Sequence, residues 1–341
     1  MVDPAQIELH KFLLEHELLA SGEQLRCRAL AGGVSSDIWL VDADRGRMCV
    51  KRALPKLKVA ADWRAPVERN AYEVAWIQVA GEIAPASAPR VLAHDEVRGM
   101  FAMNYLEPAA HPLWKQELRE GRIDSVFAAA VGETLGRIHS RTANSVDMAA
   151  RFPTDRIFRD IRLDPYLAET ARRHPDRAEA LLELVEVTAT THKTLVHGDV
   201  SPKNILVGPG GTPVFLDAEC AWYGDPAFDL AFCLNHLMLK CLWTPSAAAG
   251  FLDGFEALSN AYLASVDWEN ASDLEARAAR LLPGLFLARV DGKSPVEYLV
   301  AGGEKESVRR TARQLLVAPV ARLDEVSSRW RREISPVGDS A

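Results

Sequence analysis

Short apolar runs typical of β-strands alternate with turn residues in the first third of the sequence. Such runs occupy residues 25–29, 38–41, 47–52, 90–93 and 100–105. Between the third and the fourth run, apolar residues recur at helical spacing over residues 67–80, and a shorter amphipathic stretch at residues 7–19 precedes the first run. This order predicts a small α+β lobe with a five-stranded sheet and one inserted helix.

Helical periodicity dominates the rest of the chain. Apolar residues keep helical spacing over residues 126–141, 157–174 and 177–192. Short β-like runs follow at residues 195–196, 205–207 and 214–216, and they would carry polar residues to one edge of the helical region. With the irregular segment Leu106-Glu107-Pro108 as the boundary, we predict two lobes, residues 1–106 and 107–341, the second larger and mainly helical.

Composition and charge narrow the class of protein. The chain has 341 residues, of which 48% are apolar and 26% charged, an ordinary globular composition that suits two lobes. A net charge of −7 argues against a nucleic-acid partner, which would require a basic surface. The five cysteines are scattered, the N-terminus lacks a signal-peptide pattern, and no apolar stretch is long enough to span a membrane. We expect a cytoplasmic protein without a membrane partner, either a monomer or a homodimer.

Candidate chemistry concentrates in residues 197–229. Asp199 stands five positions before Asn204 in a loop between two β-like runs. Phosphoryl transfer needs a carboxylate that orients the attacking hydroxyl and accepts its proton, and it needs oxygen ligands for Mg²⁺. Asp199 fits the first role and Asn204 the second. Asp217 ends an apolar run and would be a second metal ligand, whereas Glu219 either joins it, faces solvent or pairs with an arginine.

The order and spacing of these residues resemble a known family. His-Gly-Asp at residues 197–199, Asn204, Asp217 and the segment 224–231 are similar to the catalytic core of the aminoglycoside phosphotransferase and choline kinase-like family. The resemblance covers most of the chain and implies a bilobal, protein-kinase-like α+β fold. It also implies that Asp199 is the catalytic base and that Asn204 and Asp217 bind Mg²⁺. Asp-Ala-Glu at residues 217–219 is similar to the Asp-x-Glu of choline and methylthioribose kinases.

Two further carboxylates and two histidines near this core are interpreted as structural. Asp225 and Asp229 begin a predicted helix, where capping and bracing of the catalytic loop are favoured over direct catalysis. His197 would brace the same loop. His139 has no third ligand at metal-site spacing, so we expect a hydrogen-bonded structural histidine.

A glycine-containing turn in the first lobe is the candidate phosphate-binding loop. Gly33, Val34, Ser35 and Ser36 lie between two predicted strands, where small residues let backbone N–H groups approach phosphates. Taken alone, the same residues would also suit a plain hairpin turn.

A lysine and a hinge would complete the nucleotide site. Lys51 ends a predicted strand, where it could reach the α- and β-phosphates of ATP, or alternatively lie in solvent. Its expected partner is Glu73 on the following helix, with Glu68 as the second candidate. The resemblance places the adenine-binding hinge at residues 103–106, with Met103, Asn104 and Leu106 as contacts. The expected cofactors are therefore ATP and Mg²⁺.

The acceptor is expected to be a small molecule with a hydroxyl group. Only a short segment separates Asp217 from Asp225, which leaves no room for an activation loop, and the Ala-Pro-Glu motif of protein kinases is missing. The candidates are an aminoglycoside-type antibiotic, which would favour an acidic pocket, and a sugar or amino-alcohol metabolite. Trp222, Tyr223 and Trp243 could line the acceptor pocket, and core packing explains them about as well. Arg289, Asp291 and Lys293 could bind a charged acceptor, but a solvated loop is the favoured interpretation. The acidic pocket could be supplied by carboxylates that would otherwise lie on surface helices, namely Asp253, Glu256, Asp267 and Glu269.

Two rival functions remain to be weighed. A catalytically inactive nucleotide-binding pseudokinase is disfavoured because Lys51, Asp199, Asn204 and Asp217 are all present. A metal-dependent hydrolase built on the same histidine and aspartates would leave the glycine turn, Lys51 and the hinge without a role.

Overall fold

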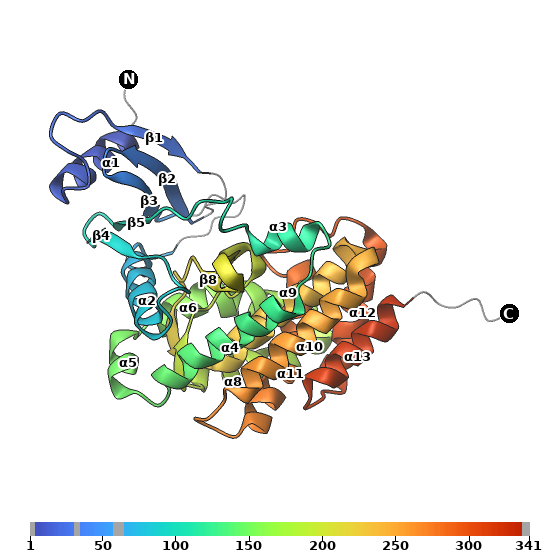
Figure 1. Ribbon diagram of the computed structural model, residues 1–341. Coiled ribbons are helices and arrows are strands. Elements are labelled where there is room, and N and C mark those ends of the chain that lie inside the picture. The colour runs from blue at the N-terminus through green and yellow to red at the C-terminus, as the bar shows by residue number, and fades with distance from the viewer. Residues whose placement is uncertain (1–3, 31–34, 57–64, 336–341) are drawn as a thin grey trace. The chain divides into compact units, whose positions relative to one another are not determined.

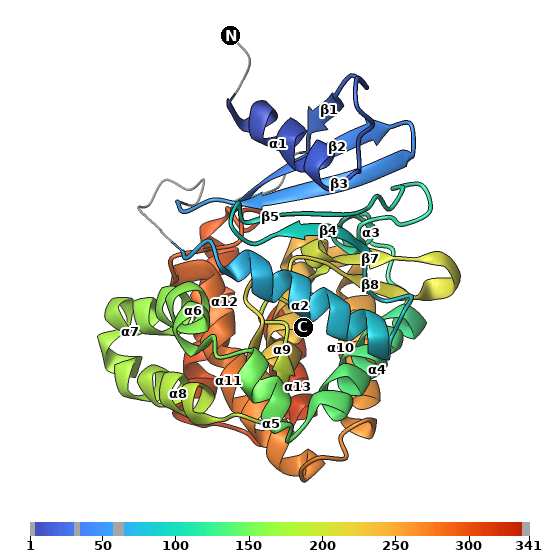
Figure 2. The same ribbon diagram turned by 90° about the vertical axis from the view of Figure 1, so that its left-hand side faces the viewer.

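The structure is a computed structural model that describes residues 4–30, 35–56 and 65–335. The chain divides into two compact units, Met1–Glu107 and Pro108–Ala341 (Figures 1 and 2). We call them the N-terminal unit and the C-terminal unit.

A five-stranded antiparallel sheet forms the N-terminal unit, as predicted. Its strand order is β1-β2-β3-β5-β4. The strands are β1 Arg26–Ala29, β2 Ser36–Ala43, β3 Gly46–Ala53, β4 Val91–Asp95 and β5 Met100–Asn104, with helix α1 at Pro4–Glu15 and helix α2 at Arg69–Ile83. The β2–β3 hairpin pairs in full register from Ser36 opposite Ala53 to Ala43 opposite Gly46. The α+β class of this lobe and its inserted helix are therefore confirmed.

The alternation of side chains along β3 separates the packing face of the sheet from the face that carries the candidate site. On the packing face, Val50 belongs to an apolar core with Phe12 of α1, Trp39 of β2 and Met100 of β5. Figure 2 shows α1 beside this sheet. Because successive residues of a strand point to opposite faces, Lys51 points away from that core. Helix α2 packs against β3, β4 and β5 and supplies the partner of Lys51.

Helices make up most of the C-terminal unit. They include α3 Trp114–Arg119, α4 Ser125–Thr142, α5 Val146–Arg151, α8 Ala178–Thr190, α9 Pro226–Trp243, α10 Ala248–Ala264, α11 Ala271–Asp291, α12 Gly302–Val317 and α13 Leu323–Ile334. Helix α9 is buried along nearly its whole length and packs against α10, α11 and α13 (Figure 1). Burial on nearly all sides fits a helix in the centre of a unit. No described helix combines the length and the apolar character needed to cross a bilayer.

Two small antiparallel strand pairs bracket the candidate catalytic loop. Strand β6 (Thr194–Val196) pairs with β9 (Trp222–Gly224), and β7 (Ile205–Val207) pairs with β8 (Pro213–Phe215). The runs at 195–196, 205–207 and 214–216 predicted three of these strands to within one residue, whereas β9, which has the same length, was not predicted.

The segment predicted as one helix over residues 157–174 is interrupted. Helix α6 (Asp155–Phe158) continues into a π-helix at Arg159–Ala168 and then into α7 (Glu169–Arg173). Pro165 lies inside the π-helix and lacks an N–H, so regular α-helical hydrogen bonding cannot run through it. The π-helix carries Arg162, which reaches the catalytic loop.

Close packing of α4 on α10 gives a testable prediction of stability. A Cβ atom at Gly132 would lie 2.2 Å from the backbone oxygen of Leu258, so Gly132→Ala must push the two helices apart. We expect a loss of about 1–3 kcal/mol in the free energy of unfolding, measured by urea denaturation. The control is Gly303→Ala in α12, where no atom lies within 4 Å of the new Cβ and stability should rise by up to about 1 kcal/mol. Equal stability of the two variants would contradict this packing.

Candidate active site

The backbone of the candidate catalytic loop, residues 197–204, is held by a buried carboxylate at the start of α9. Asp229 accepts hydrogen bonds from the N–H groups of His197 at 2.7 Å and Gly198 at 2.8 Å. His139 lies 3.3 Å from the same carboxylate and contacts the Tyr262 hydroxyl at 2.7 Å. Asp229 and His139 thus have the bracing, structural positions expected from the sequence.

The ring of His197 joins two backbone segments of the site. Its Nδ1 accepts from the N–H of Asp199 at 3.1 Å, and its Nε2 lies 3.1 Å from the carbonyl oxygen of Leu216. A carbonyl can only accept, so Nε2 carries the proton. Burial lowers the pKa of His197, which keeps the ring neutral. The ring braces the loop and has no free nitrogen with which to move protons.

Gly198 is required by space as well as by backbone conformation. Its φ of +79° lies in the left-handed region, and a Cβ atom there would lie 2.6 Å from the backbone oxygen of Cys220. The loop therefore passes directly against the segment that follows Asp217.

Two cations surround the carboxylate of the candidate base. Arg162 Nη2 lies 2.9 Å and Lys203 Nζ 3.1 Å from Asp199 Oδ2. Arg162 also donates through Nε to the carbonyl of Gly198 at 2.5 Å. Burial by itself raises the pKa of Asp199, but the Arg162 guanidinium and the Lys203 ammonium outweigh it and hold the pKa below its usual range. Asp199 is thus a buried carboxylate that stays ionised.

Sequence reasoning missed Arg162. It belongs to no motif, and the periodicity of residues 157–174 predicted an ordinary helix. The only local signal was Pro165 within that helical pattern, which indicates an irregular turn but not its direction.

Asn204 and Asp217 lie at the same end of the β7–β8 pair. The N–H of Leu216 donates to the carbonyl of Asn204 at 2.9 Å, which extends the strand pairing to the residue before Asp217. The amide nitrogen of Asn204 donates to the carbonyl of Asp199 at 3.0 Å, so its Oδ1 is turned away from that bond. Asp217 has a φ of +68°, a conformation that few residues other than glycine adopt. Its charge acts on both Asp199 and Lys203.

This donor set fits a magnesium ion. Mg²⁺ prefers oxygen ligands, takes one or two carboxylates and fills its remaining positions with water and phosphate. Among the described residues no cluster of three or more histidine, cysteine, aspartate or glutamate side chains forms a metal site, so the ion would rest on the Asn204 amide and few carboxylates. Glu219 is 8% exposed, so the alternative that it faces solvent is wrong. It lies within electrostatic reach of Arg162.

The candidate nucleotide residues of the N-terminal unit form a second group. Lys51 Nζ donates to both carboxylate oxygens of Glu73 at 2.8 Å, and both side chains are buried, so Lys51 does not lie in solvent. Glu68, the second candidate partner, is exposed at the N-terminus of α2. Gly33 and Val34 lie outside the described residues.

The end of the candidate phosphate loop is fixed by an arginine that sequence reasoning also missed. Arg69 of α2 donates through Nη2 to the carbonyls of Ser35 at 2.6 Å and Leu54 at 2.8 Å. Ser36 follows as the first residue of β2. Since the partners of Arg69 are backbone carbonyls, no side-chain pattern in the sequence could reveal them.

The predicted hinge residues lie in and after β5. Met103 and Asn104 are the last residues of the strand, and Leu106 follows it half-buried. The Asn104 side chain accepts from the N–H of Arg90 at 2.6 Å, which ties β5 to the residue before β4. The side chain at position 104 is thus used for structure, and its backbone N–H donates to the carbonyl of Arg90 at 3.0 Å.

The aromatic and basic residues that were candidates to contact the acceptor have different surroundings in the structure. Trp222 stacks on Phe158 at 4.3 Å, and the Tyr223 hydroxyl donates to the carbonyl of Lys193 at 2.9 Å, so both are packing residues. Arg289 is buried in α11, so the expectation of a solvated loop is wrong for this residue. Trp243 stacks on Tyr298 at 4.3 Å.

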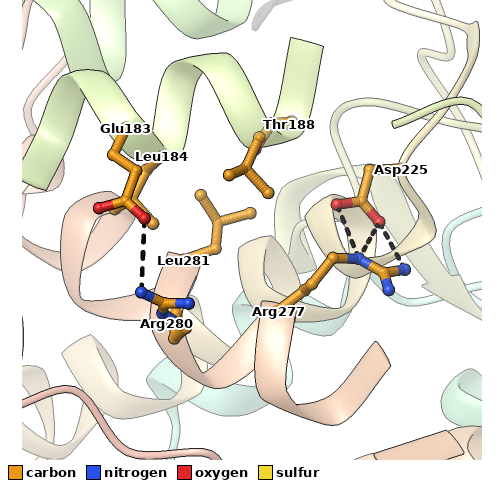
Figure 3. A pocket seen from close by; sticks show the side chains of 8 residues that line it. Glu183, Leu184, Thr188, Asp225, Arg277, Arg280 and Leu281 are labelled. Carbon is orange, nitrogen blue, oxygen red and sulfur yellow. Dashed lines mark hydrogen bonds and ion pairs between the residues drawn. The ribbon is translucent and has the colours of Figure 1, made fainter. Parts of the chain in front are cut away.

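Asp225 joins α9 to α11. Its side chain caps α9 by accepting from the N–H of Ala227 at 3.1 Å, and it pairs with Arg277 of α11 at 3.1 Å (Figure 3). Arg277 is held on its other side by Glu269 at 2.8 Å. Asp225 is 1% exposed, so this pair anchors the start of the helix that carries Asp229.

The chain is similar to phosphotransferases over most of its length. The model of the phosphotransferase enzyme family matches residues 26–274. Methylthioribose kinase 1 of Oryza sativa is 24% identical over 254 residues, which cover 66% of this chain and 59% of that protein. The methylthioribose kinase of Erwinia tasmaniensis is 26% identical over 237 residues, covering 62% and 58%. The chain thus spans less than two thirds of the length of these relatives.

Solved structures with the same fold are more distant in sequence. An amicoumacin kinase in complex with AMP-PNP, Ca²⁺ and Ami superposes with a TM-score of 0.53 at 12% identity, covering 94% of this chain and 98% of that one. An ethanolamine kinase of Plasmodium vivax gives a TM-score of 0.53 at 12% identity, covering 87% and 84%. These similarities confirm the kinase-like fold, with its small sheet lobe and helical lobe.

The Asp225–Arg277 pair gives a second prediction of stability. Arg277→Met would leave the buried Asp225 carboxylate without its cation, and we expect the free energy of unfolding to fall by about 3 kcal/mol. The control is Arg280→Met, one turn along the same face of α11, because Arg280 forms only an exposed pair with Glu183 at 3.5 Å (Figure 3). That change should alter stability by no more than about 0.5 kcal/mol. Similar losses in the two variants would show that the Asp225 pair does not anchor α9.

Proposed function

The chain belongs to the phosphotransferase enzyme family, and from this we propose that it transfers the γ-phosphoryl group of MgATP to a hydroxyl of a small molecule. One observation carries the proposal most directly. Asp199 is buried, kept ionised by Arg162 and Lys203, and located in a loop whose Asn204 presents an amide oxygen. A general base and a metal ligand side by side are what phosphoryl transfer to a hydroxyl requires.

In this mechanism Asp199 accepts a hydrogen bond from the acceptor hydroxyl and takes its proton as the new bond to phosphorus forms. Arg162 keeps the carboxylate ionised and fixes its direction, since it bonds Asp199 and the Gly198 carbonyl at the same time. Asn204 and Asp217 would hold Mg²⁺, with Glu219 as a further candidate. Bound there, Mg²⁺ would neutralise the charge that develops on the phosphoryl group.

Residues of the N-terminal unit would bind the nucleotide. Lys51, positioned by Glu73, would contact the α- and β-phosphates, and the backbone of Gly33 to Ser36 would contact the phosphates through its N–H groups. The backbone at Met103, Asn104 and Leu106 would contact adenine. The pairing of Lys51 with Glu73 supports this assignment, because it holds the ammonium group in one place.

A small acceptor is favoured over a protein. Between Asp217 and Asp225 the chain forms only a turn and the short strand β9, which leaves no peptide-docking segment. The two relatives matched by sequence, from Oryza sativa and Erwinia tasmaniensis, are methylthioribose kinases, which supports a sugar-like acceptor. The pseudokinase alternative is not supported, because Lys51, Asp199 and Asn204 each keep the contacts that their catalytic roles require.

The base assignment is tested by Asp199→Asn. We expect turnover with MgATP and a panel of methylthioribose, aminoglycosides, choline and other alcohols to fall by about 10²–10⁴-fold, because the amide cannot accept the proton. Binding of MgATP, measured by calorimetry, should persist. The control is Asp147→Asn in α5, an exposed carboxylate, which should leave both quantities unchanged. Absence of MgATP binding to the wild-type protein would refute the kinase proposal.

The role of Arg162 has a separate signature. Arg162→Met should lower kcat by about 10–100-fold, because Asp199 loses its orientation, with little change in the KM for ATP. The pKa of Asp199 should rise without the guanidinium, so activity should be lost at a higher pH on acidification than in the wild type. Arg159→Met on the same π-helix, whose side chain is half exposed and lies 3.4 Å from Asp164, is the control. This role would be contradicted if Arg162→Met and the wild type lost activity at the same pH on acidification.

A further inference from the structure

Two buried cations of the C-terminal unit have no carboxylate partner among the described residues. They are Lys240 of α9, which is 1% exposed, and Arg289 of α11, which is 9% exposed. Arg289 contacts only neutral groups, namely the Tyr166 hydroxyl at 3.2 Å and the carbonyl and hydroxyl of Ser294. Its Nε is buried without a hydrogen-bond partner in the described part of the chain. We call Lys240 and Arg289 the unpaired cations.

The surroundings of Lys240 are aromatic. Its ammonium lies 4.5 Å from the ring centre of Trp243 and 4.7 Å from that of Tyr298. The Tyr298 hydroxyl is a further buried polar atom that has no partner among the described residues. Cation–π contacts offset part of the loss of water around an ammonium, but they supply no anion. The Nε of Arg289 and the hydroxyl of Tyr298 are donors that remain to be satisfied.

Basic side chains outnumber carboxylates around Lys240. Burial, with Lys115 adding to it, lowers the pKa of Lys240 to about 7. Burial and the charges of Arg289, Lys240, Lys203 and Lys115 lower the pKa of His236 well below its usual value. The carboxylate that opposes these charges at Lys240 is Glu297, and it already pairs with Lys115. Lys51 and Arg162, by contrast, each have a carboxylate within 3 Å.

Direct contacts connect the unpaired cations to the catalytic base. Arg289 bonds the hydroxyl of Tyr166, and Arg162 lies over the ring of the same tyrosine at 5.8 Å while its Nη2 pairs with Asp199 at 2.9 Å. Lys203, the other partner of Asp199, is among the charges that act on His236. Two side chains, Tyr166 and Arg162, thus connect Arg289 to Asp199.

We propose that Lys240 and Arg289 bind an anionic group of the phosphoryl acceptor, a carboxylate or a phosphate. The inference rests on the proposed kinase function and names its substrate class: a hydroxylated acid or a phosphorylated alcohol. A charged hydrogen-bonding group would pair with both cations and would accept from Arg289 Nε and the Tyr298 hydroxyl. A polycationic aminoglycoside would be repelled by the same charges.

The carboxylates that might have formed an acidic pocket for an aminoglycoside are occupied or dispersed. Glu269 pairs with Arg277 at 2.8 Å, Glu256 pairs with Arg331 at 3.4 Å, and Asp267 accepts from Ser140 at 2.8 Å. Asp253 is exposed. None of them contacts Lys240 or Arg289.

The test measures ligand binding by calorimetry in the absence of nucleotide, using the full chain. The probes form a matched set: gluconate and glucose 6-phosphate are anionic, glucose is neutral, and glucosamine and kanamycin are cationic. We expect the anionic probes to bind at least about tenfold more tightly than glucose, and the cationic ones to bind most weakly. Tighter binding of gluconate would identify a carboxylate as the preferred group, and tighter binding of glucose 6-phosphate a phosphate. No binding of either anionic probe, or a preference for neutral or cationic probes, would overturn the proposal.

Two variants assign the binding to these side chains. Lys240→Met and Arg289→Met should each weaken the anionic probes by about 10–100-fold while MgATP binding stays unchanged. Lys305→Met in α12 and Arg280→Met in α11 are the matched controls and should bind the probes as the wild type does. Undiminished anion binding in both Lys240→Met and Arg289→Met would refute the assignment.

A measurement on the wild-type protein covers the case in which a variant does not fold. Acetylation of Lys240 by acetic anhydride, followed by mass spectrometry, should be slowed by gluconate or glucose 6-phosphate and not by glucose, whereas acetylation of Lys305 should be unaffected. Equal rates at Lys240 with and without the anions would overturn the proposal. These ligand-binding experiments contain no nucleotide, so their outcome does not depend on MgATP. The kinase function would be refuted separately, by a finding that the protein does not bind MgATP.

Discussion

The two hydrogen bonds from the catalytic-loop backbone to Asp229 are the interaction on which the candidate site depends. They fix the N–H groups of His197 and Gly198, and so determine where Asp199 leaves the loop. Asp229 is fully buried in the first turn of α9, so the loop is attached to the central helix of the unit rather than to its surface. Gly198 completes the constraint, because any side chain there would collide with Cys220.

Buried ion pairs in this protein fix the positions of side chains more than they add to stability. Removing a carboxylate or a cation from water costs several kcal/mol, which a good partner only roughly offsets. Lys51 with Glu73 and Arg162 with Asp199 therefore contribute little to folding, but each holds one reactive group in one place. The unpaired Lys240 and Arg289 fit the same pattern only if a ligand supplies the missing anion.

Local patterns predicted most of the fold because they depend on neighbours in the sequence. Short apolar runs between turn residues located the five strands of the first sheet, and helical spacing located α2, α4 and α8. The errors occurred where a distant contact outweighs the local pattern. The predicted α-helix contains a π-helix with Pro165 inside it. The strand that was not predicted, β9, is paired with β6, which lies far from it in the sequence.

By itself, the sequence determined the order and spacing of Asp199, Asn204 and Asp217, the pairing candidate Glu73 for Lys51, and the family resemblance that these residues carry. It did so because a loop motif is a local property of the chain. Only the tertiary structure decided that Arg162 contacts Asp199 and that Glu219 is buried. It also decided that Lys240 and Arg289 are buried without a carboxylate partner among the described residues. Those facts depend on which side chains from distant elements pack together. Burial among them determines how much free energy each charged group loses when it leaves water.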